Sequence, residues 1–422
     1  MPTDPANTDV RMRGFARRTT VEDALAWVDN QTRCLPSEFV SLWQAAGRVL
    51  AAEVVSATNV PGFDRSMMDG YALHAADTQG ATAYQRMELK IVGQSLPGQP
   101  FAGSVAPGQA VRIMTGAPLP AGADAVLPAE RTEAIEETLF ALDEVSPGKN
   151  IGRAGEDIAC GASVLPTGRV LRPQDVGVLS SLGLAKVQVV RRPRVRIVVT
   201  GNELQSAGTP AEGCRIADSN GPMLAALVER DGGVAILGGV DNRQQGDYLV
   251  PDNPAAILAA MHDPADIVLV SGGSSVGQED HAPLLVARHG ELAIHGIAMR
   301  PSSPTGMGRI GAALVFLLPG NPVSCLCAYD FFAGRAIRRL AGRPPAWPYR
   351  PIRLPLARKL VSQVGRVDYA RVRIARGHVE PVAISGASIL SSTTVADGFV
   401  VVSADCEGFP AGAEVEVWRY DD

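Results

Sequence analysis

The sequence predicts a multidomain protein of the α/β plus β class, with a doubly wound α/β domain, an inserted β-rich domain and a C-terminal β-barrel. Three observations predict this fold. The chain has 422 residues, which is more than one hydrophobic core normally organises. Four apolar runs rich in β-branched residues alternate with helical patterns in its middle, as in a parallel sheet. Before and after this middle part, the chain consists mainly of short runs in which apolar and polar residues alternate, separated by tight turns.

The composition is that of a globular protein, and the length suits an enzyme. Hydrophobic residues make up 46% of the chain and charged residues 20%. The 39 basic and 44 acidic residues give a net charge of -5, so no chain-wide field would hold a nucleic-acid backbone. The most apolar stretch, 312–334, is interrupted by Pro319, Asn321 and Asp330, and we expect no membrane span. The first 18 residues lack the apolar core of a secretory signal, so we expect a loose tail and a cytoplasmic protein.

Six scattered cysteines indicate reduced, mostly buried thiols. They form no C-x-x-C pair and have no histidine at zinc-ligand spacing. Cys325 and Cys327 suggest either a metal or nucleophile site, or two small buried side chains. Residues two apart on a helix point in different directions, which favours the second interpretation.

The first half of the chain shows two kinds of local pattern. Helical periodicity over 19–49 predicts two helices, the first capped by Thr19 or Thr20. Pro-Gly pairs at 97/98, 107/108 and 147/148 indicate tight turns in a β-rich insertion. A helix is predicted over 173–182, with proline in its first turn and Gly183 at its C-cap.

The middle of the chain predicts the parallel sheet. Its predicted strands are 195–199, 234–237, 267–270 and 314–318. Its predicted helices are 222–230, 254–261, 283–288 and 322–340. A proline-rich linker follows. After it, apolar and polar residues alternate in short runs with a turn at 410–412, a pattern typical of a small β-barrel or sandwich. The predicted domains are 19–55 together with 149–192, 56–148, 193–342 and 347–422.

Three polar loops follow predicted strands, at 200–204, 271–280 and 318–324. The carboxyl ends of parallel strands meet at one edge of a sheet, so we expect these loops to converge. Gly272 and Gly273 let backbone amides approach an anion, and the next two serines add hydroxyl donors. The loops therefore predict a phosphate site, against the alternative that they are merely tight turns.

Carboxylates form a second group of candidates. Glu203 and Asp280 each follow a strand in a glycine-containing loop, where their oxygens suit Mg²⁺ held between phosphates. Asp218 has two interpretations, an N-cap for the following helix or a site residue.

Seven segments, in order, resemble the molybdopterin molybdenumtransferase family, which includes bacterial MoeA and the animal gephyrin E-domain. The resemblance extends from about residue 21 to 418, and its most specific segments are 68–72, 113–117, 155–157, 200–204, 218–220, 271–280 and 318–324. It implies an elongated homodimer of four-domain subunits, with 19–55 and 149–192 as a linker and dimerisation domain. It also implies that 193–342 binds molybdopterin, and that the active site joins this domain to the Asp69 loop of the partner subunit.

The implied reaction inserts molybdate into adenylylated molybdopterin, with Mg²⁺ and release of AMP. Motif matching assigns catalytic positions to Asp69, Thr115, Asp157, Glu203, Asp280 and Arg371. It assigns substrate binding to Asp218, Ser219, Gly272, Gly273, Ser274, Ser275, Arg300, Ser303, Pro319, Gly320, Asn321 and Ser388. The implied metal ligands are Glu203, Asp280 and, in a looser alignment, Asp241. The implied partners are a second copy, the enzyme that adenylylates molybdopterin, and the molybdoenzymes that receive the cofactor.

The sequence departs from the family at one segment. The family has the form Lys-Pro-Gly-Lys-Pro where this chain has Arg300-Pro301-Ser302-Ser303-Pro304. Arg300 keeps a charge that can fork onto a phosphate or molybdate oxygen, whereas Ser303 keeps only a hydroxyl. Asn202 stands where an aspartate is common, which partly offsets this loss of positive charge. The departure motivates an alternative function, a non-catalytic paralogue that delivers the pterin or the finished cofactor. A neighbouring step such as pterin adenylylation is a third possibility.

Overall fold

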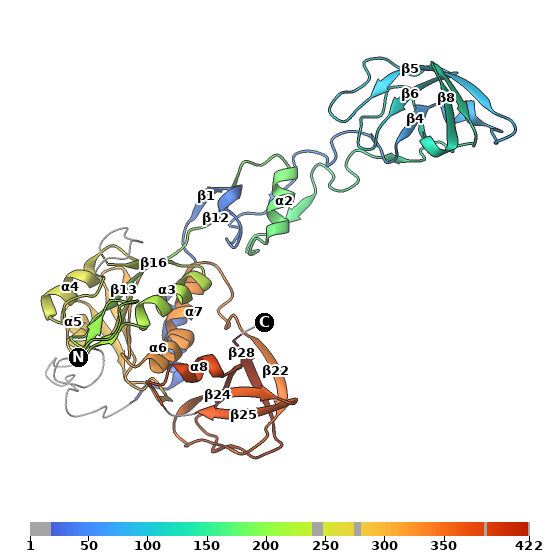
Figure 1. The fold of residues 1–422 in the computed structure, drawn as a ribbon. Helices are drawn as coiled ribbons and strands as arrows, with labels where there is room; N and C mark the ends of the chain where they lie inside the picture. The colour runs from blue at the N-terminus through green and yellow to red at the C-terminus, as the bar shows by residue number, and fades with distance from the viewer. Residues whose placement is uncertain (1–17, 239–247, 274–279, 384–385, 421–422) are drawn as a thin grey trace. The chain divides into compact units, whose positions relative to one another are not determined.

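The computed structural model describes residues 18–238, 248–273, 280–383 and 386–420. These residues form two compact units, both visible in Figure 1. The smaller unit comprises Phe39–Ala46 and Leu50–Gln188, and the larger unit holds the other described residues. Strands β1 (Ser37–Ser41) and β12 (Lys186–Val190) carry the chain across the boundary.

The main part of the smaller unit is a six-stranded sheet in the order β7-β4-β6-β5-β9-β8. The strands are β4 (Gly70–Leu73), β5 (Met87–Ser95), β6 (Gln109–Ile113), β7 (Ala125–Pro128), β8 (Thr132–Ile135) and β9 (Thr138–Ala141). Leu73, Leu89 and Leu139 are buried in its core. Each predicted Pro-Gly turn has its glycine at positive φ, where a residue without Cβ is favoured. The predicted β-rich character of this segment is confirmed.

Short elements complete the smaller unit. Strand β2 (Val54–Val55) pairs with β11 (Ser163–Leu165), and β3 (Arg65–Ser66) with β10 (Ile151–Gly152). Two short 3-10 turns, η3 (Ala75–Thr78) and η4 (Ala129–Arg131), accompany the sheet. Helix α2 (Pro173–Ser181) is confirmed with Gly183 at positive φ beyond its end.

The second helix predicted within 42–49 is wrong. The structure has a single 3-10 turn there, η2 (Leu42–Gln44), followed by Gly47 at φ +75. The amide of Leu50 then donates to the carbonyl of Arg169. Pairing with a distant segment therefore overrides a helical period that is short and weak. The first predicted helix is confirmed as α1 (Val21–Gln31), capped by the Thr20 side chain.

The centre of the larger unit is a six-stranded sheet in the order β16-β13-β17-β21-β20-β18. The four predicted parallel strands are present as β13 (Arg194–Val199), β16 (Val234–Leu237), β17 (Ile267–Ser271) and β21 (Ala313–Leu318). Two antiparallel strands that the sequence did not reveal, β18 (Glu291–His295) and β20 (Gly306–Ile310), extend one side.

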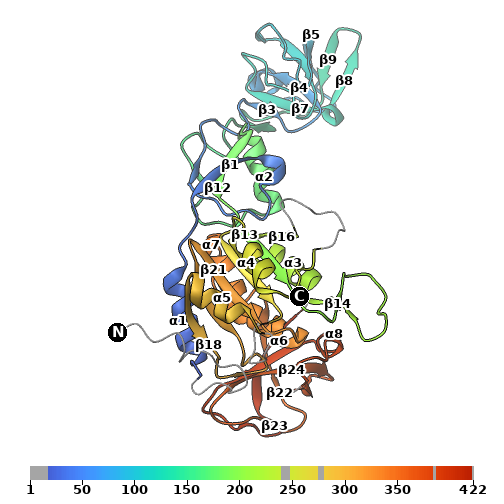
Figure 2. The ribbon, with the colours of Figure 1, turned by 90° about the vertical axis from the view of Figure 1, so that its left-hand side faces the viewer.

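Helices cover both faces of this sheet. One face packs on α1, α3 (Asn220–Arg230), α6 (Pro322–Ala328) and α7 (Gly334–Leu340), and the other on α4 (Pro254–His262) and α5 (Ala282–His289). Figures 1 and 2 show this layering. Val198 and Val270 face α4 and α5, whereas Ile197 and Leu269 face the other layer. Both faces are buried, and for this reason the strands appear in the sequence as continuous apolar runs. A π-helical segment, η5 (Tyr329–Ala333), joins α6 to α7.

The C-terminal part of the larger unit is the predicted barrel. Its sheet runs β19-β24-β26-β28-β22, with β25 paired to β24. The strands are β19 (Met299–Arg300), β22 (Arg350–Pro355), β24 (Val367–Ala375), β25 (His378–Ala383), β26 (Gly398–Val402) and β28 (Glu414–Arg419). A bridge from Leu356 to Val379 closes the sheet on itself. The accompanying short elements are β14 (Leu204–Gln205), β15 (Ile216–Ala217), β23 (Leu360–Val361), β27 (Gly408–Phe409) and α8 (Ser391–Val395).

A buried ionic network joins the barrel to the α/β layers. Arg230 forms ion pairs of 3.0 Å with both Asp231 and Asp330. Tyr349, just before β22, donates to Asp330 at 3.0 Å. Burial raises the pKa of Asp330, and the Arg230 guanidinium opposes that rise. Paired buried charges tolerate little displacement, so the network fixes the barrel against the helices.

The cysteines divide into two groups. The expectation that most thiols are buried is wrong, because Cys34, Cys160 and Cys214 are exposed on loops. Cys325 and Cys327 are fully buried within α6, which confirms their interpretation as small core residues. Burial raises the pKa of Cys325 to about 12, so its thiol stays protonated at neutral pH.

No described helix combines the length and the apolar character that crossing a membrane requires.

Candidate functional site

The described parts of the three predicted polar loops begin at the carboxyl edge of the sheet in the larger unit. They follow β13, β17 and β21, which are adjacent strands in the order β13-β17-β21. From β13 the chain passes through α3 to β16 on one side, and later through α4 to β17 on the other. The ends of β13 and β17 therefore form a topological switch point, where open α/β sheets bind their ligands.

The first two loops are in very close contact. Gly272 has φ +98, and a Cβ at this position would lie 2.1 Å from the carbonyl oxygen of Thr200. Only glycine allows this approach, because the clash would be with backbone. Gly272 and Gly273 are half-buried, so part of each residue remains accessible.

Asn220 links the second loop to the third. Its Nδ2 donates to Ser271 Oγ at 2.9 Å and to the carbonyl of Gly320 at 2.7 Å. The side chain is buried, and its Oδ1 has no hydrogen-bond partner among the described residues. A single amide thus sets the spacing between the glycine loop and the Pro319–Asn321 turn.

Asp218 caps helix α3, which confirms that interpretation. Its Oδ1 accepts from the amide of Asn220 at 2.8 Å, and its Oδ2 from the amide of Gly221 at 3.0 Å. Tyr248 also donates to Oδ2, at 2.6 Å. Burial and the Asp218 carboxylate together raise the pKa of Tyr248. Ser219 is exposed beside them.

The two candidate metal ligands differ in exposure. Glu203 is exposed, and its carboxylate lies close to Gly201, where an added Cβ would meet Oε2 at 2.8 Å. Asp280 is half-buried. The described residues contain no group of three or more His, Cys, Asp or Glu side chains that could hold a metal ion. One or two carboxylates nevertheless suit Mg²⁺, which takes its other ligands from water and substrate phosphates.

A cavity of about 440 Å³ opens beside the first loop. Its walls include Gly201, Asn202, Gln205 and Arg215. Thr200 Oγ1 donates to Asp252, another wall residue, at 3.1 Å. The cavity is lined largely by polar residues of the loop that follows β13 and is open to solvent. It therefore suits a charged ligand better than an apolar one.

Arg300 is engaged by a carboxylate of the barrel. Its Nε donates to Asp368 Oδ1 at 2.9 Å, and its Nη2 donates to Oδ2. Asp368 is fully buried and also accepts from Ser362 Oγ at 2.7 Å. The guanidinium fork that the sequence suggested for a phosphate or molybdate oxygen is therefore occupied by Asp368 in this structure.

The rest of this segment packs on the start of α6. Ser302 has φ +92, a value that favours the glycine of the family pattern. The Ser302 Oγ donates to the carbonyl of Ser324 at 2.6 Å, and Thr305 Oγ1 donates to the carbonyl of Ser302 at 2.8 Å. Ser303 is half-buried and accepts from Arg18 Nε at 2.9 Å. These contacts hold the segment, here called the 300–305 loop, next to the Pro319–Asn321 turn.

The barrel contributes one loop to the same region. The amide of Val323, in the first turn of α6, donates to the carbonyl of Ala387 at 2.9 Å. The next residue, Ser388, is exposed. Arg371 is fully buried within β24, so its side chain is not exposed at the surface of the described structure.

The remaining candidates lie in the smaller unit. Asp69 Oδ1 accepts from both the amide and the hydroxyl of Thr115, each at 2.7 Å. The hydrogen bond from the Thr115 amide, reinforced by that from its hydroxyl, lowers the pKa of Asp69. Asp157 is exposed on a loop anchored by its own amide to the carbonyl of Val60. Ser274, Ser275 and Asp241 lie outside the described residues.

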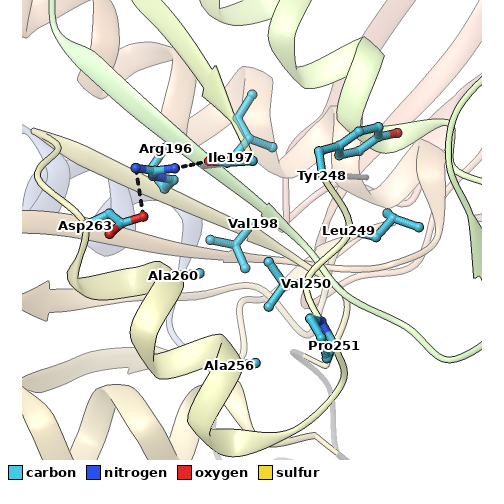
Figure 3. Close-up of a pocket in the computed structure, with 11 residues that line it drawn as sticks. Arg196, Ile197, Val198, Tyr248, Leu249, Val250, Pro251, Ala256, Ala260 and Asp263 are labelled. Atoms are coloured by element: carbon cyan, nitrogen blue, oxygen red, sulfur yellow. Dashed lines mark hydrogen bonds and ion pairs between the residues drawn. The ribbon is translucent and has the colours of Figure 1, made fainter. Parts of the chain in front are cut away.

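A second cavity, of about 250 Å³, lies between β13 and α4. Figure 3 shows its apolar wall of Val198, Ala256 and Ala260, with Arg196 at one end. Arg196 pairs with Asp263 at 2.9 Å, so its charge is already balanced. We assign this cavity no role in the site.

Three family models match successive parts of the chain. The MoeA N-terminal region (domain I and II) matches residues 19–183, the probable molybdopterin binding domain 196–339, and the MoeA C-terminal region (domain IV) 353–420. Molybdopterin molybdenumtransferase 2 of Mycobacterium tuberculosis is 36% identical over 388 residues, which is 90% of this chain and 94% of that protein. The chain belongs to the molybdopterin molybdenumtransferase family.

Further comparisons agree with membership of the molybdenumtransferase family. The molybdopterin molybdenumtransferase of Staphylococcus aureus is 31% identical over 402 residues, or 94% of each chain. The crystal structure of the molybdopterin biosynthesis MoeA protein from Pyrococcus horikosii covers 96% of this chain and 100% of its own, with a TM-score of 0.80 at 29% identity. The predicted multidomain α/β plus β class is confirmed.

Sequence reasoning missed four residues that shape the site of this molybdenumtransferase family member. Asn220 lies within the 218–220 segment, and its position at the start of a helix after a polar loop was a usable signal. Asp368 lies in the same strand as Arg371 and gave a weaker signal. Tyr248 and Arg18 gave none, because their partners Asp218 and Ser303 are distant in sequence.

Proposed function

We propose that this chain inserts molybdate into adenylylated molybdopterin and releases AMP, as a transferase of molybdenum cofactor biosynthesis. One observation carries the proposal. A chain that belongs to the family over nine-tenths of its length keeps three polar, glycine-containing loops on adjacent strand ends. Water that attacks a phosphorus of the pyrophosphate linkage breaks its P–O bond and releases AMP. The two dithiolene sulfurs then bind the molybdenum of molybdate and displace one of its oxygens, which leaves as water with the two thiol protons.

We infer that Mg²⁺ is the divalent ion, with Glu203, Asp280 and, from outside the described residues, Asp241 as its protein ligands. Carboxylate oxygens are the donors that this ion prefers, which supports the inference. The bound ion would neutralise the pyrophosphate charge and polarise the linkage to AMP.

The chain's own groups orient the substrate. Backbone amides of Gly272 and Gly273 donate to phosphate oxygens, and Asn220 keeps this loop at a fixed spacing from Gly320. Asp218, Ser219, Pro319, Asn321 and Ser388 border the pterin. A preorganised set of donors costs no rearrangement when charge develops on the leaving group.

We infer that Asp69, Thr115 and Asp157 reach the site from the partner protomer of a homodimer. The family resemblance supports this assignment. The two hydrogen bonds from Thr115 hold the Asp69 carboxylate in a fixed orientation, as a residue that contacts the substrate requires. We place the protein in the cytoplasm, where reduced thiols persist and where the adenylylating enzyme and the molybdoenzymes are its partners.

The test uses the full chain with adenylylated molybdopterin, molybdate and Mg²⁺. AMP release with molybdenum retained on the pterin is the expected result. Tight binding of the pterin without AMP release would instead identify a protein that only carries the cofactor. The relatives, which are named as molybdenumtransferases, do not favour this alternative. Repeating the assay with chelator or without molybdate checks the metal and the oxyanion separately.

A further inference from the structure

The loop between β14 and β15 brings an arginine to the cavity beside the first site loop. Leu204 pairs in parallel with Ile216, and the amide of Ile216 donates to the carbonyl of Glu203 at 2.8 Å. The amide of Arg215 donates to the carbonyl of Glu212 at 3.0 Å. The backbone is therefore held on both sides of Arg215, which is one of the residues that line the cavity of about 440 Å³.

The charge of Arg215 is not balanced within the described structure. Its side chain is exposed and forms no hydrogen bond or ion pair with any residue that the structure describes. Among the described residues that line the cavity, Arg215 is the only cation and Asp252 the only carboxylate. Asp252 already accepts from Thr200 Oγ1 at 3.1 Å. The cavity therefore offers one guanidinium that can bind an anion.

The cavity adjoins the glycine loop that is the candidate phosphate site. Gly201 lines the cavity, and the preceding residue, Thr200, has the carbonyl oxygen that leaves no room for a Cβ on Gly272. A pyrophosphate bound by the amides of Gly272 and Gly273 therefore lies next to the cavity. One half of the substrate can enter it from there.

The size and the walls of the cavity suit a nucleotide better than a bare oxyanion. Its volume falls within the range of small-molecule sites, about 300–1,000 Å³. A tetrahedral oxyanion such as molybdate would leave most of this volume empty. Asn202 and Ser206 bring hydrogen-bonding side chains to the wall, whereas Leu249 and Pro251 bring an apolar surface on which a base can lie.

We propose that this cavity is the subsite for the AMP half of adenylylated molybdopterin, and that Arg215 is a substrate-binding residue that contacts the phosphate of AMP. The inference rests on the function proposed above, which supplies the nucleotide. Glu203, the inferred ligand of the divalent ion, precedes the strand residue that pairs with Ile216 and so lies beside Arg215 in the register. A phosphate between the ion and the guanidinium neutralises both, and its oxygens match the guanidinium fork.

The test titrates AMP and adenosine into the full chain with Mg²⁺ at low ionic strength. It compares Arg215→Gln and Arg215→Lys with Arg33→Gln, in which an exposed arginine just beyond the end of α1 is the control for charge. Arg215→Gln should weaken AMP binding about tenfold through loss of one charge-assisted contact, and should leave adenosine binding unchanged. Arg215→Lys should keep part of the affinity for AMP, and Arg33→Gln all of it.

Equal affinities of Arg215→Gln and Arg33→Gln for AMP would overturn the proposal. An equal loss of AMP and adenosine binding in Arg215→Gln would also overturn it, because a displaced loop rather than a lost phosphate contact would explain that result. A titration with molybdate that weakens while AMP binding does not would assign Arg215 to the other oxyanion and would likewise refute the nucleotide subsite.

These titrations require no turnover, so their outcome is separate from that of the proposed function. If the chain releases no AMP from the pterin adenylate but Arg215→Gln still weakens AMP binding alone, the proposed function fails and the nucleotide subsite stands. If the chain does release AMP, Arg215→Gln should raise KM for the pterin adenylate about tenfold and leave KM for molybdate unchanged. An unchanged KM for the pterin adenylate would remove Arg215 from the site.

Discussion

Gly272 has no room for a side chain, because its Cβ would lie 2.1 Å from the Thr200 carbonyl oxygen. Gly272→Ala should force the β13 and β17 loops apart and should raise KM for the pterin substrate at least about tenfold. The unfavourable φ of +98 adds a loss of about 2 kcal/mol in the free energy of unfolding. Steady-state kinetics and urea denaturation measure the two effects.

Gly311 provides the control for this substitution. It also has a positive φ, +57, but a Cβ added there would have no atom within 4 Å. Gly311→Ala should therefore cost about 1 kcal/mol of stability and leave KM unchanged. An equal effect of the two substitutions on KM would show that the close approach at Gly272 does not shape the site.

Asp280→Asn should reduce AMP release roughly 100-fold or more, since an amide loses the negative charge that a divalent ion and a polarised pyrophosphate require. The near-isosteric change should leave the circular dichroism spectrum and the melting temperature as in the wild type. Asp405→Asn is the control, because Asp405 is an exposed carboxylate that pairs locally with Ser403. Unchanged turnover in Asp280→Asn would remove Asp280 from the mechanism.

The sequence predicted where the loops of the site lie along the chain, but it did not predict the hydrogen bonds and ion pairs between them. Glycines and carboxylates after apolar strands could be recognised locally. The bridge from Asn220 to Gly320 and the fork from Arg300 to Asp368 join residues 100 and 68 positions apart, so no local pattern records them. Arg300 could be recognised as a cation, but the carboxylate that engages it could not.

At the scale of elements, helix α2 depends on one buried carboxylate. Asp175 accepts from Arg169 Nη2 at 2.8 Å and from the amide of Arg172 at 2.9 Å. The Arg169 hydrogen bond, helped by Arg172, lowers the pKa of Asp175 far below its ordinary value against the opposing effect of burial. The group therefore stabilises the fold above its unfolded pKa of about 3.9, and this contribution is lost as the pH falls below that value.

Asp175→Asn should thus lower the free energy of unfolding by about 2 kcal/mol at pH 7 and flatten its pH dependence below about pH 4. Urea denaturation followed by circular dichroism at a series of pH values measures both. Glu133→Gln, in an exposed pair with Arg86, should change stability by less than about 1 kcal/mol. A mutant that keeps the wild-type pH dependence would contradict the role assigned to Asp175.

Elements with strong local signals were predictable, and those fixed by distant partners were not. The four parallel strands and α2 have continuous apolar runs or clear caps. Strands β18 and β20 have mixed sequences and form because they pair with each other and with β21. The helix expected within 42–49 failed for the same reason, since its backbone pairs with a segment more than 100 residues away.

At the scale of the whole molecule, the assigned catalytic residues divide between the two units. Asp69, Thr115 and Asp157 belong to the smaller unit, and Glu203, Asp280 and Arg371 to the larger. The sequence predicted both folds because each has its own pattern. It could not derive how the two sets meet, since this depends on an assembly that no local pattern encodes, and the proposed homodimer rests on the family resemblance.

Mixing two inactive variants tests that assembly. If each site takes Asp69 from one protomer and Asp280 from the other, a heterodimer of Asp69→Asn and Asp280→Asn has one intact site. Random exchange in an equal mixture makes half the dimers mixed, so activity should return to about a quarter of the wild-type value. Glu203→Gln mixed with Asp280→Asn is the control, because both changes affect the larger unit and no mixed dimer regains a complete site. Background activity in both mixtures would mean that each protomer completes its own site, and the division of residues between protomers would have to be abandoned.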